Sequence, residues 1–383
     1  MQNLHLPRRI LGEQRGKEGR NMNEKRVFNF AAGPSAIPEE VLAEAGAEIM
    51  NYRGSGMSVM EMSHRSKAFL SIFEETKDTL RRLMKVPEDF EILFLQGGAT
   101  LQFAMAPMNF ITRTGKADYA ITGSFAGKAA DEAKKYGDIA IAASSKEKNH
   151  TYIPAQSELK IREDASYFYY CANNTIYGTE WQYTPQTPAG VPLVADMSSD
   201  ILTRYVDWSK YALVFAGAQK NMAPAGVTAV FVNKNYIGSA LPYTPVMLDY
   251  AAMVKGDSMH NTPPCWSIYM MGLIMKWVEK MGGIEAMDAR KRQRSKLLYD
   301  VIDHSSLYKG CAEKDSRSFM NVTFVTGDPE VDKRFIAGAK EAGIENVNGH
   351  RSVGGMRASI YNAMSIEGTQ ALADYMVEFE KKG

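Results

Sequence analysis

Seven short apolar runs, each about the length of a β-strand, constrain the fold of this chain more than any other feature of its sequence. The runs are apolar throughout, which is typical of strands buried on both faces of a parallel sheet. Segments that favour a helix, such as 127–136, separate several of them. The runs span residues 91–95, 118–122, 138–142, 166–171, 192–195, 211–215 and 227–232. We therefore predict an α/β fold whose large domain holds a mostly parallel, seven-stranded sheet covered by helices.

Two helices are predicted before the first run. Pro38 and the two acidic residues after it are typical of a helix start, and Val41, Leu42, Ala45 and Ile49 then form one apolar stripe. The second predicted helix has apolar residues at helical spacing, namely Phe69, Ile72, Phe73, Leu80 and Leu83.

The sequence pattern changes after Gly282 and Gly283. A helix rich in Arg and Lys (286–302) is followed by a strand (319–325), a helix (331–342), a strand (356–361) and a final helix. In that last helix one face carries Leu372, Tyr375, Met376 and Phe379. We predict a smaller α+β domain at the C-terminal end, of an ordinary domain size.

The charge balance excludes some classes of partner. The chain has 45 Lys and Arg residues against 44 Asp and Glu residues, so no overall field attracts nucleic acid or a membrane. Residues 1–30 are the exception, with seven basic and three acidic groups. Residues 1–22 lack the apolar run of a secretory signal, and we interpret them as a disordered basic extension, with Met22 as an alternative start. A nucleic-acid-binding arm is the competing hypothesis for this segment.

The cysteines and the most apolar predicted helix indicate the cellular compartment of the protein. Cys171, Cys265 and Cys311 are odd in number and far apart, so they form neither a disulfide framework nor a CxxC metal site. The most apolar helical segment, 267–281, contains two charged residues and is shorter than the ~20 residues that a membrane span needs. We expect a cytoplasmic protein with no metal ion and no membrane or nucleic-acid partner.

Polar residues that directly follow the apolar runs are the candidate ligand contacts, because open α/β sheets bind ligands at the carboxyl ends of their strands. Gly97, Gly98, Ala99 and Thr100 follow the first run and precede a predicted helix. Such a turn lets backbone N–H groups approach a phosphate, although glycine pairs also mark ordinary turns. The segment matches neither the dinucleotide-binding nor the P-loop motif.

Four further residues follow other runs. Asp196 is either a helix cap, half of a salt bridge, or the counter-ion of a bound cation. Lys220 lies in a small, apolar, glycine-rich segment, and such surroundings favour an uncharged amine that can attack a carbonyl. Thr175 and Phe125, taken singly, are interpreted as a turn hydroxyl and a core aromatic.

One cofactor accounts for these residues together. Pyridoxal phosphate needs a lysine for covalent attachment, an acid at its pyridine nitrogen, an anion-binding turn and a flat group against its ring. Lys220, Asp196, the turn that ends at Thr100 and Phe125 supply one of each. The sequence therefore predicts pyridoxal 5′-phosphate as the cofactor.

Longer motifs add a family resemblance. They are SVMEMSHR (58–65), AGAQKN (216–221), HNTPP (260–264) and HRSVGGMRAS (350–359). From Asn29 to its C-terminus the sequence resembles the phosphoserine aminotransferase family of fold-type-I pyridoxal-phosphate enzymes. The resemblance implies an aspartate-aminotransferase-like fold, with a large cofactor-binding domain at 39–284 and a small domain formed by 23–38 and 285–383. It also implies a homodimer with active sites at the interface.

The resemblance assigns roles to individual residues. Lys220 and Asp196 are the implied catalytic residues. The implied cofactor-binding residues are Ala99, Thr100, Phe125, Thr175, Asp196, Gln219 and Lys220, with Asn261 and Thr262 contributed by the partner subunit. The implied substrate-binding residues are Arg65 and Arg357 for carboxylates, and His64, His350 and Arg351 for a phosphate. The chain departs from the family pattern at Phe125, where tryptophan is frequent, at Asn174, where glutamate is expected, and at Ala32, where serine is common.

The activity implied by the resemblance is transfer of the amino group of L-glutamate to 3-phosphohydroxypyruvate by a ping-pong mechanism. This reaction serves L-serine biosynthesis, and pyridoxine biosynthesis is a second pathway open to it. The alternative is another fold-type-I transaminase with a different pair of small amino acid and oxo acid. A desulfurase is disfavoured because it needs a mobile nucleophilic cysteine, and Cys171 lies in a predicted strand.

Overall fold

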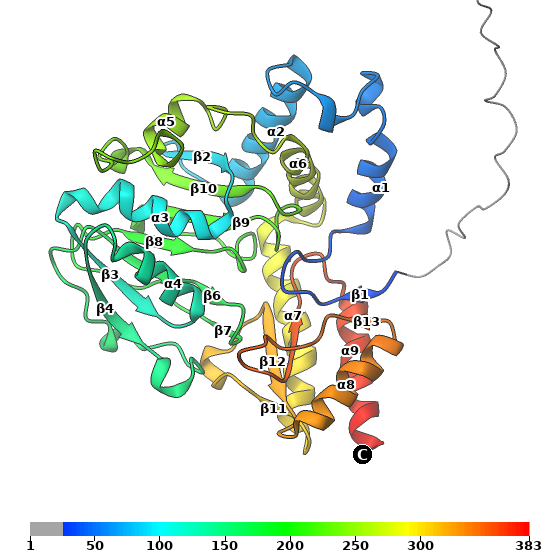
Figure 1. The fold of residues 1–383 in the computed structure, drawn as a ribbon. Coiled ribbons are helices and arrows are strands. Elements are labelled where there is room, and N and C mark those ends of the chain that lie inside the picture. The colour runs from blue at the N-terminus through cyan, green and yellow to red at the C-terminus, as the bar shows by residue number, and fades with distance from the viewer. Residues whose placement is uncertain (1–25, 383) are drawn as a thin grey trace, which may run out of the picture.

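A seven-stranded sheet forms the centre of the larger part of the molecule (Figure 1). The computed structural model describes residues 26–382, so the extension predicted for residues 1–22 lies outside the described residues. Each of the seven predicted apolar runs is a strand of this sheet, and together they confirm the predicted α/β fold. In spatial order the strands are β2 (Phe90–Leu95), β10 (Thr228–Asn233), β9 (Tyr211–Gly217), β8 (Leu193–Asp196), β5 (Phe168–Cys171), β3 (Lys116–Ile121) and β4 (Asp138–Ser144).

The sheet is parallel except at β10, which runs antiparallel to both of its neighbours, β2 and β9. Residues 218–227 connect β9 to β10 without a crossover helix, and only an antiparallel pair can be joined so directly. This short connection contains Lys220. The antiparallel strand therefore brings the predicted reactive lysine to one end of the sheet.

Both faces of the sheet are covered, and alternate strand residues contribute to two different cores. In β2, for example, Ile92 and Phe94 pack in one core while Leu93 and Leu95 pack in the other. Helices α2 (Lys67–Met84) and α6 (Cys265–Lys280) pack together and contribute to the first core. Helices α3 (Gly98–Phe110), α4 (Ser124–Ala133) and α5 (Tyr250–Lys255) contribute residues to, or pack against, the second core.

Two expectations about burial are wrong in part. Strand β4 lies at the edge of the sheet beside β3 alone, so Ile141 is 45% exposed although its run is apolar. Helix α1 (Glu39–Glu48) begins as predicted and buries Val41 and Ala45, but Leu42 and Ile49 of the same stripe are exposed. The reason is that α1 packs against α6 through a narrow face. The buried face of α2, in contrast, contains all five predicted residues.

The smaller α+β part combines C-terminal elements with the first described strand. Its three-stranded antiparallel sheet has the order β11 (Lys309–Gly310), β12 (Asn321–Val325), β14 (Met356–Ser359), and its helices are α7 (Gly283–His304), α8 (Pro329–Glu341) and α9 (Ile366–Lys381). Strand β1 (Phe28–Asn29) pairs with β13 (Ile344–Glu345), and Phe30 packs in the same core as Leu372 and Met376 of α9.

On this basis we propose the division expected from the sequence, with a large unit at 39–284 and a small unit at 23–38 plus 285–383, of which residues 23–25 and 383 lie outside the described residues. The boundary then falls within the first turn of α7. A two-stranded ribbon, β6 (Asn173–Asn174) with β7 (Thr179–Glu180), belongs to the large unit and contacts the small unit. The Asn173 side chain donates to Asn321 Oδ1 at 2.7 Å and accepts from Ser318 Oγ at 2.6 Å.

Residues 26–382 contain neither a membrane-spanning helix nor a cluster of metal-binding side chains. None of the helices described there combines the length and apolar character that crossing a bilayer requires. The same residues contain no group of three or more His, Cys, Asp or Glu side chains placed to hold a metal ion.

Candidate active site

The amine of Lys220 meets a hydroxyl from another strand end. Lys220 Nζ donates a hydrogen bond to Thr175 Oγ1 at 2.8 Å. Thr175 is buried and directly follows β6, while Lys220 lies in the loop that follows β9. The two residues lie 45 positions apart in the chain. They meet because Thr175 comes four residues after the end of β5 and Lys220 three residues after the end of β9, and both strands run parallel in the seven-stranded sheet.

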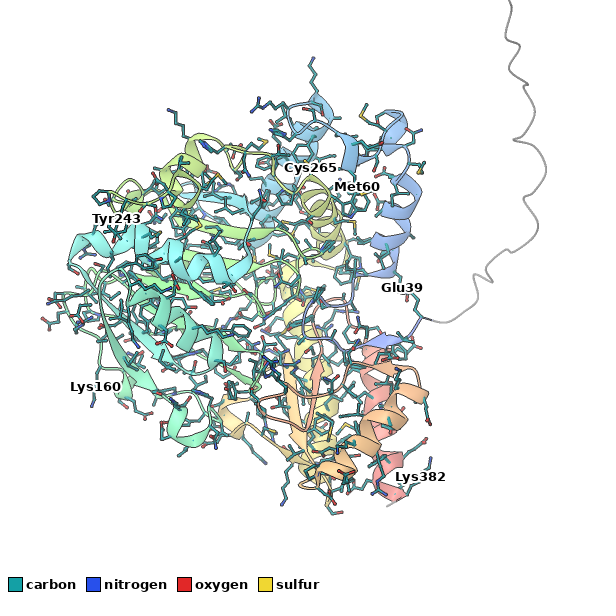
Figure 2. The ribbon with its side chains drawn as sticks, viewed as in Figure 1. Glu39, Met60, Lys160, Tyr243, Cys265 and Lys382 are labelled. Carbon is teal, nitrogen blue, oxygen red and sulfur yellow. The ribbon has the colours of Figure 1, made fainter. Side chains whose placement is uncertain are left out.

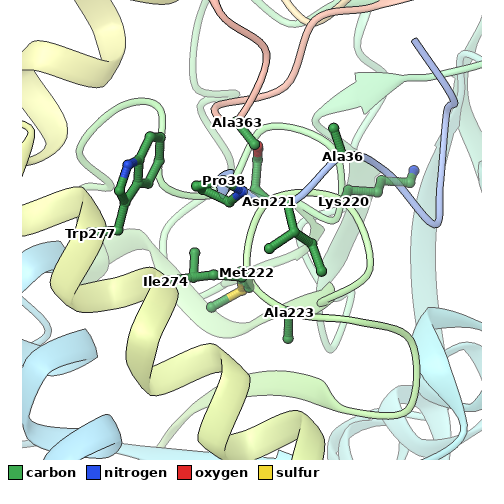
Figure 3. A pocket seen from close by; sticks show the side chains of 10 residues that line it. Ala36, Pro38, Lys220, Asn221, Met222, Ala223, Ile274, Trp277 and Ala363 are labelled. Atoms are coloured by element: carbon green, nitrogen blue, oxygen red, sulfur yellow. The ribbon is translucent and has the colours of Figure 1, made fainter. Parts of the chain in front are cut away.

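A small cavity lies behind the Lys220 loop, but the amine does not point into it (Figure 3). Its lining includes Pro38, Ile274 and Trp277. In Figure 3 the Lys220 side chain extends away from Trp277 and Ile274. The reactive side of this loop is therefore the side that faces Thr175.

Asp196 is a buried carboxylate at the end of β8 with a fixed orientation. Its Oδ1 accepts hydrogen bonds from Ser198 N at 2.9 Å and from Ser198 Oγ at 2.6 Å, while within residues 26–382 its Oδ2 accepts none. Burial raises the pKa of Asp196, and the Ser198 hydrogen bonds and the charge of Lys220 act in the opposite direction. A cationic group near Oδ2 would favour the ionised form of this carboxylate.

Phe125 lies in the first turn of α4, with its ring close to the same amine. The distance from Lys220 Nζ to the Phe125 ring centroid is 5.7 Å. Ser124 precedes it, and the Ser124 hydroxyl is hydrogen-bonded to the Tyr177 hydroxyl at 2.8 Å. The start of α4 is thereby tied to the segment that carries Thr175.

The turn between β2 and α3 has the backbone of an anion-binding site. Gly97 and Gly98 have φ angles of 87° and 65°, and Ala99 and Thr100 follow in the first turn of α3. The first N–H groups of a helix have no partner within the helix and attract negative charge. Helix α3 packs against β9, the strand that leads into the Lys220 loop.

Gln219 belongs to a close packing arrangement with residues 33–35. Its backbone oxygen accepts a hydrogen bond from Ser35 N at 3.0 Å, and Ser35 Oγ donates to the backbone oxygen of Lys220 at 2.5 Å. A Cβ atom at Gly33, whose φ is 136°, would lie 3.3 Å from Lys220 Cγ. Sequence reasoning did not identify Ser35, although it lies in the Gly-Pro-Ser segment before the first predicted helix.

A group of cations, drawn from the small unit and from α4 of the large unit, completes the arrangement. Arg357, in β14, donates from Nη1 to the backbone oxygen of Thr175 at 3.4 Å, and its buried Nε has no hydrogen-bond partner within residues 26–382. Burial lowers the pKa of Arg357. Burial and the charges of Arg357, Arg351 and Lys128 lower the pKa of His350. In the part of the chain that the structure describes, none of these three cations forms an ion pair, so the group suits an anionic ligand.

Four predicted site residues are not brought to this group. Within residues 26–382, no hydrogen bond, ion pair or ring contact joins His64 or Arg65 to Lys220, Thr175 or Arg357. Among these residues His64 Nε2 is buried and has no hydrogen-bond partner, and Arg65 is exposed. The other two are Asn261 and Thr262. The backbone oxygen of Thr262 accepts from the Gln96 side chain at 3.1 Å beside the β2–α3 turn, and this is their one hydrogen bond toward the site in the described part of the chain.

Residues 27–372 match the family model of class-V aminotransferases. The chain belongs to this family.

Curated relatives extend over almost the whole length of this class-V aminotransferase. It is 49% identical over 359 residues to a phosphoserine aminotransferase of Lysinibacillus sphaericus, a match that covers 94% of the chain and 99% of the relative. It is 48% identical over 364 residues to a phosphoserine aminotransferase of Nitrosomonas europaea, with 93% and 99% coverage.

Solved structures agree. A phosphoserine aminotransferase studied for radiation damage of its Schiff base superposes with a TM-score of 0.91 and 46% identity, covering 94% of this chain and 100% of the other. Phosphoserine aminotransferase from Bacillus circulans gives a TM-score of 0.91 at 44% identity, covering 93% and 99%. The pyridoxal-phosphate-bound phosphoserine aminotransferase from Trichomonas vaginalis gives a TM-score of 0.88 at 40% identity. This match covers 92% of this chain and 100% of the other.

The residues of this class-V aminotransferase fit pyridoxal phosphate. Asp196 offers a ring cation its Oδ2 oxygen, which accepts no hydrogen bond within residues 26–382. Lys220 offers an amine, and Phe125 offers a flat face beside that amine. The start of α3 offers N–H groups to a phosphate. Each of these features is observed in the structure of this chain and does not depend on its relatives.

Sequence reasoning missed residues that orient this group. Ser198 Oγ donates to Asp196 and accepts from Gly217 N at 2.9 Å, so it links the ends of β8 and β9. The spacing Asp-x-Ser after a strand is the signal that could have identified it, since such a pair closes a local turn. Asn174 is buried and donates to the hydroxyls of Thr122 and Thr179, both at 3.1 Å.

Proposed function

We propose that this chain is a phosphoserine aminotransferase that uses pyridoxal 5′-phosphate to transfer the amino group of L-glutamate to 3-phosphohydroxypyruvate. The observation that carries the proposal is a group of cations that form no ion pair within residues 26–382, of which Arg357 meets the Lys220 amine through Thr175. Both substrates are polyanions, one with two carboxylates and the other with a carboxylate and a phosphate. A reactive amine that adjoins arginines without counter-ions suits such molecules.

The cofactor, when bound, withdraws electrons from the substrate Cα and so makes the proton on that atom removable. Lys220 Nζ is the residue that takes this proton and returns it, as general base and then general acid. Asp196, held by Ser198, keeps a proton on the pyridine nitrogen because its ionised form gains a cationic partner there.

Other residues hold the cofactor in position. Ala99 and Thr100 bind its phosphate through the start of α3, assisted by Gln219. Phe125 stacks on the ring, and Thr175 binds the phenolic oxygen through the hydroxyl that Lys220 contacts in this structure.

The substrate groups are divided between two sets of cations. Arg357 binds the α-carboxylate, since its planar guanidinium has a free, buried Nε beside the Lys220–Thr175 pair. His350 and Arg351 bind the phosphate of the phosphorylated substrate. Arg65 and His64 complete the two subsites from the partner subunit.

We further propose a cytoplasmic homodimer that acts in L-serine biosynthesis. Met50, Met57 and Met60 are 81%, 43% and 56% exposed, and exposed apolar side chains suit an interface. Figure 2 marks Met60 in the part of the molecule that contains α1 and α6. The turn that contains Met60 packs against α6, and the loop of Asn261 and Thr262 comes just before that helix. An interface here would bring these residues and the 64–65 pair to the partner's site.

A coupled assay tests the function. The purified protein with pyridoxal phosphate is expected to convert glutamate and 3-phosphohydroxypyruvate, and to lose this activity in Lys220→Ala. Arg351→Ala is expected to lower kcat/KM for phosphoserine about 10- to 100-fold, the value of a charge-assisted hydrogen bond, with a smaller change for glutamate. Activity with oxo acids that lack a phosphate, at rates equal to those with 3-phosphohydroxypyruvate, would instead support the alternative transaminase.

A further inference from the structure

Lys128 is a cation near the reactive amine that the assignments above leave unused. It lies one turn after Phe125 in α4, and its Nζ is 5.7 Å from the Phe125 ring centroid. Lys220 Nζ lies at the same distance from the same ring. One aromatic side chain therefore has two ammonium groups near it, one from its own helix and one from the Lys220 loop.

Cations surround Lys128, and its side chain forms no hydrogen bond and no ion pair within residues 26–382. The other lysines of this segment differ, since Lys134 pairs with Asp131 at 2.8 Å and Lys135 pairs with Glu132 at 2.6 Å. The charge of Lys128 also acts on His350, together with the charges of Arg351 and Arg357.

Bringing four basic side chains together is unfavourable unless an anion joins them. The carboxylates one turn after Lys128, Asp131 and Glu132, pair with Lys134 and Lys135 instead. A lysine suits a group that carries several negative charges at any angle, because its ammonium is a compact point charge on a flexible stem. A phosphate carries more negative charge than a carboxylate and presents its oxygens in more directions. Lys128 lies beside Phe125, and its charge acts on His350, one of the two residues assigned above to the phosphate.

We propose that Lys128 is a further substrate-binding residue that contacts the phosphate group of the phosphorylated substrate from the α4 side of the site. The proposal rests on the proposed function and deepens it. Lys128 and the His350–Arg351 loop then hold the phosphate from two separate elements, one in each structural unit. Lys128 selects for a dianion and contributes little to a substrate that ends in a carboxylate.

The test compares Lys128→Met with Lys128→Arg in the intact holoenzyme. Lys128→Met is expected to raise KM for phosphoserine about 10-fold and to weaken inhibition by inorganic phosphate by a similar factor, with kcat within about 2-fold of the parent. The KM for glutamate is expected to change less than about 3-fold, and Lys128→Arg is expected to restore most of the affinity for phosphoserine. Raising the ionic strength should reduce the difference in KM for phosphoserine between the parent and Lys128→Met, because salt screens the charge of Lys128.

Lys134→Met is the matched control, since it removes the same charge at the far end of α4, where the lysine already has an acidic partner. Suppose that Lys128→Met and Lys134→Met give the same KM for phosphoserine while the parent still prefers phosphoserine to serine. The role proposed for Lys128 is then wrong, and the proposed function stands. If the parent shows no preference for a phosphorylated substrate, the proposed function itself fails.

Discussion

At the scale of single residues, Asp196 shows how a catalytic group can oppose stability. Burial raises the pKa of Asp196, so the folded, cofactor-free chain holds this proton more tightly than the unfolded chain does. Stability therefore decreases as the pH rises from the ordinary aspartate pKa of about 3.9 through the raised value. A bound pyridinium removes this penalty because it pairs with the ionised carboxylate.

Asp196→Asn is accordingly expected to separate stability from activity. Asn keeps an oxygen for the two Ser198 hydrogen bonds and removes the buried charge, so the Tm of the cofactor-free protein should equal or exceed that of the parent at pH 7. The advantage should shrink as the pH falls toward 4, while transamination falls more than about 100-fold at all pH values. Thermal unfolding and the coupled assay, each run from pH 4 to 8, measure both effects.

Asp200→Asn is the contrasting variant. Burial raises the pKa of Asp200 as well, to about 6, but Asp200 pairs with Arg204 at 2.8 Å. Neutralising it therefore leaves a partly buried guanidinium without its carboxylate partner, and this loss should lower Tm at pH 7. A lower Tm for both variants would contradict the account given for Asp196.

Apart from Arg357, whose role came from the family resemblance, the residues that the structure brings to Lys220 are those whose position follows from strand ends. Lys220, Thr175, Asp196 and Phe125 each follow an apolar run, and the ends of parallel strands meet at one edge of a sheet. His64 and Arg65 follow no strand, and their roles come from the family resemblance alone. Ser198 and Lys128 were missed because a hydroxyl and a surface lysine are common near strand ends and helix starts.

At the scale of elements, the β2–α3 turn depends on one glycine more than on its neighbour. Gly97 and Gly98 both have positive φ angles, which cost about 1–2 kcal/mol for a residue with a Cβ. Only at Gly97 is there also a steric conflict, since a Cβ would lie 2.6 Å from Leu101 Cβ, whereas at Gly98 it meets open space. Leu101 is held in α3, so relief of this conflict would move the first turn of the helix.

Gly97→Ala is therefore expected to weaken binding of pyridoxal phosphate about 10-fold or more, with Gly98→Ala showing the smaller effect of backbone strain alone. Titration of the cofactor-free variants, followed by absorbance, measures both affinities. Equal losses in the two variants would show that the left-handed backbone matters and that the contact with Leu101 does not.

The element predictions succeeded where burial decided the pattern. The seven runs became strands, and α2 buries the face that its spacing predicted. The direction of β10 could not be predicted from its composition, because an apolar strand in the interior of a sheet looks alike in either direction. The exposed residues of α1 and the edge position of β4 depend on which neighbours are present, and sequence periodicity does not encode that.

At the scale of the whole molecule, the candidate site is divided between two units and, by our proposal, between two subunits. Lys220 and Thr175 belong to the large unit, whereas Arg357 reaches Thr175 from the small unit. His64 and Arg65 belong to the same chain but make no contact with this group within residues 26–382. If they serve catalysis, they must reach the Lys220 of another subunit.

Complementation between two inactive variants tests this arrangement. Lys220→Ala and Arg65→Ala should each abolish or strongly reduce activity as homodimers. When the two variants are co-expressed, a mixed dimer regains one complete site, built from the intact Lys220 of one chain and the intact Arg65 of the other. With random pairing, about half of the dimers are mixed, and activity should return to about a quarter of the parent value. If Arg65 acts on the Lys220 of its own chain, no mixed dimer contains a complete site and activity stays at the level of the separate variants.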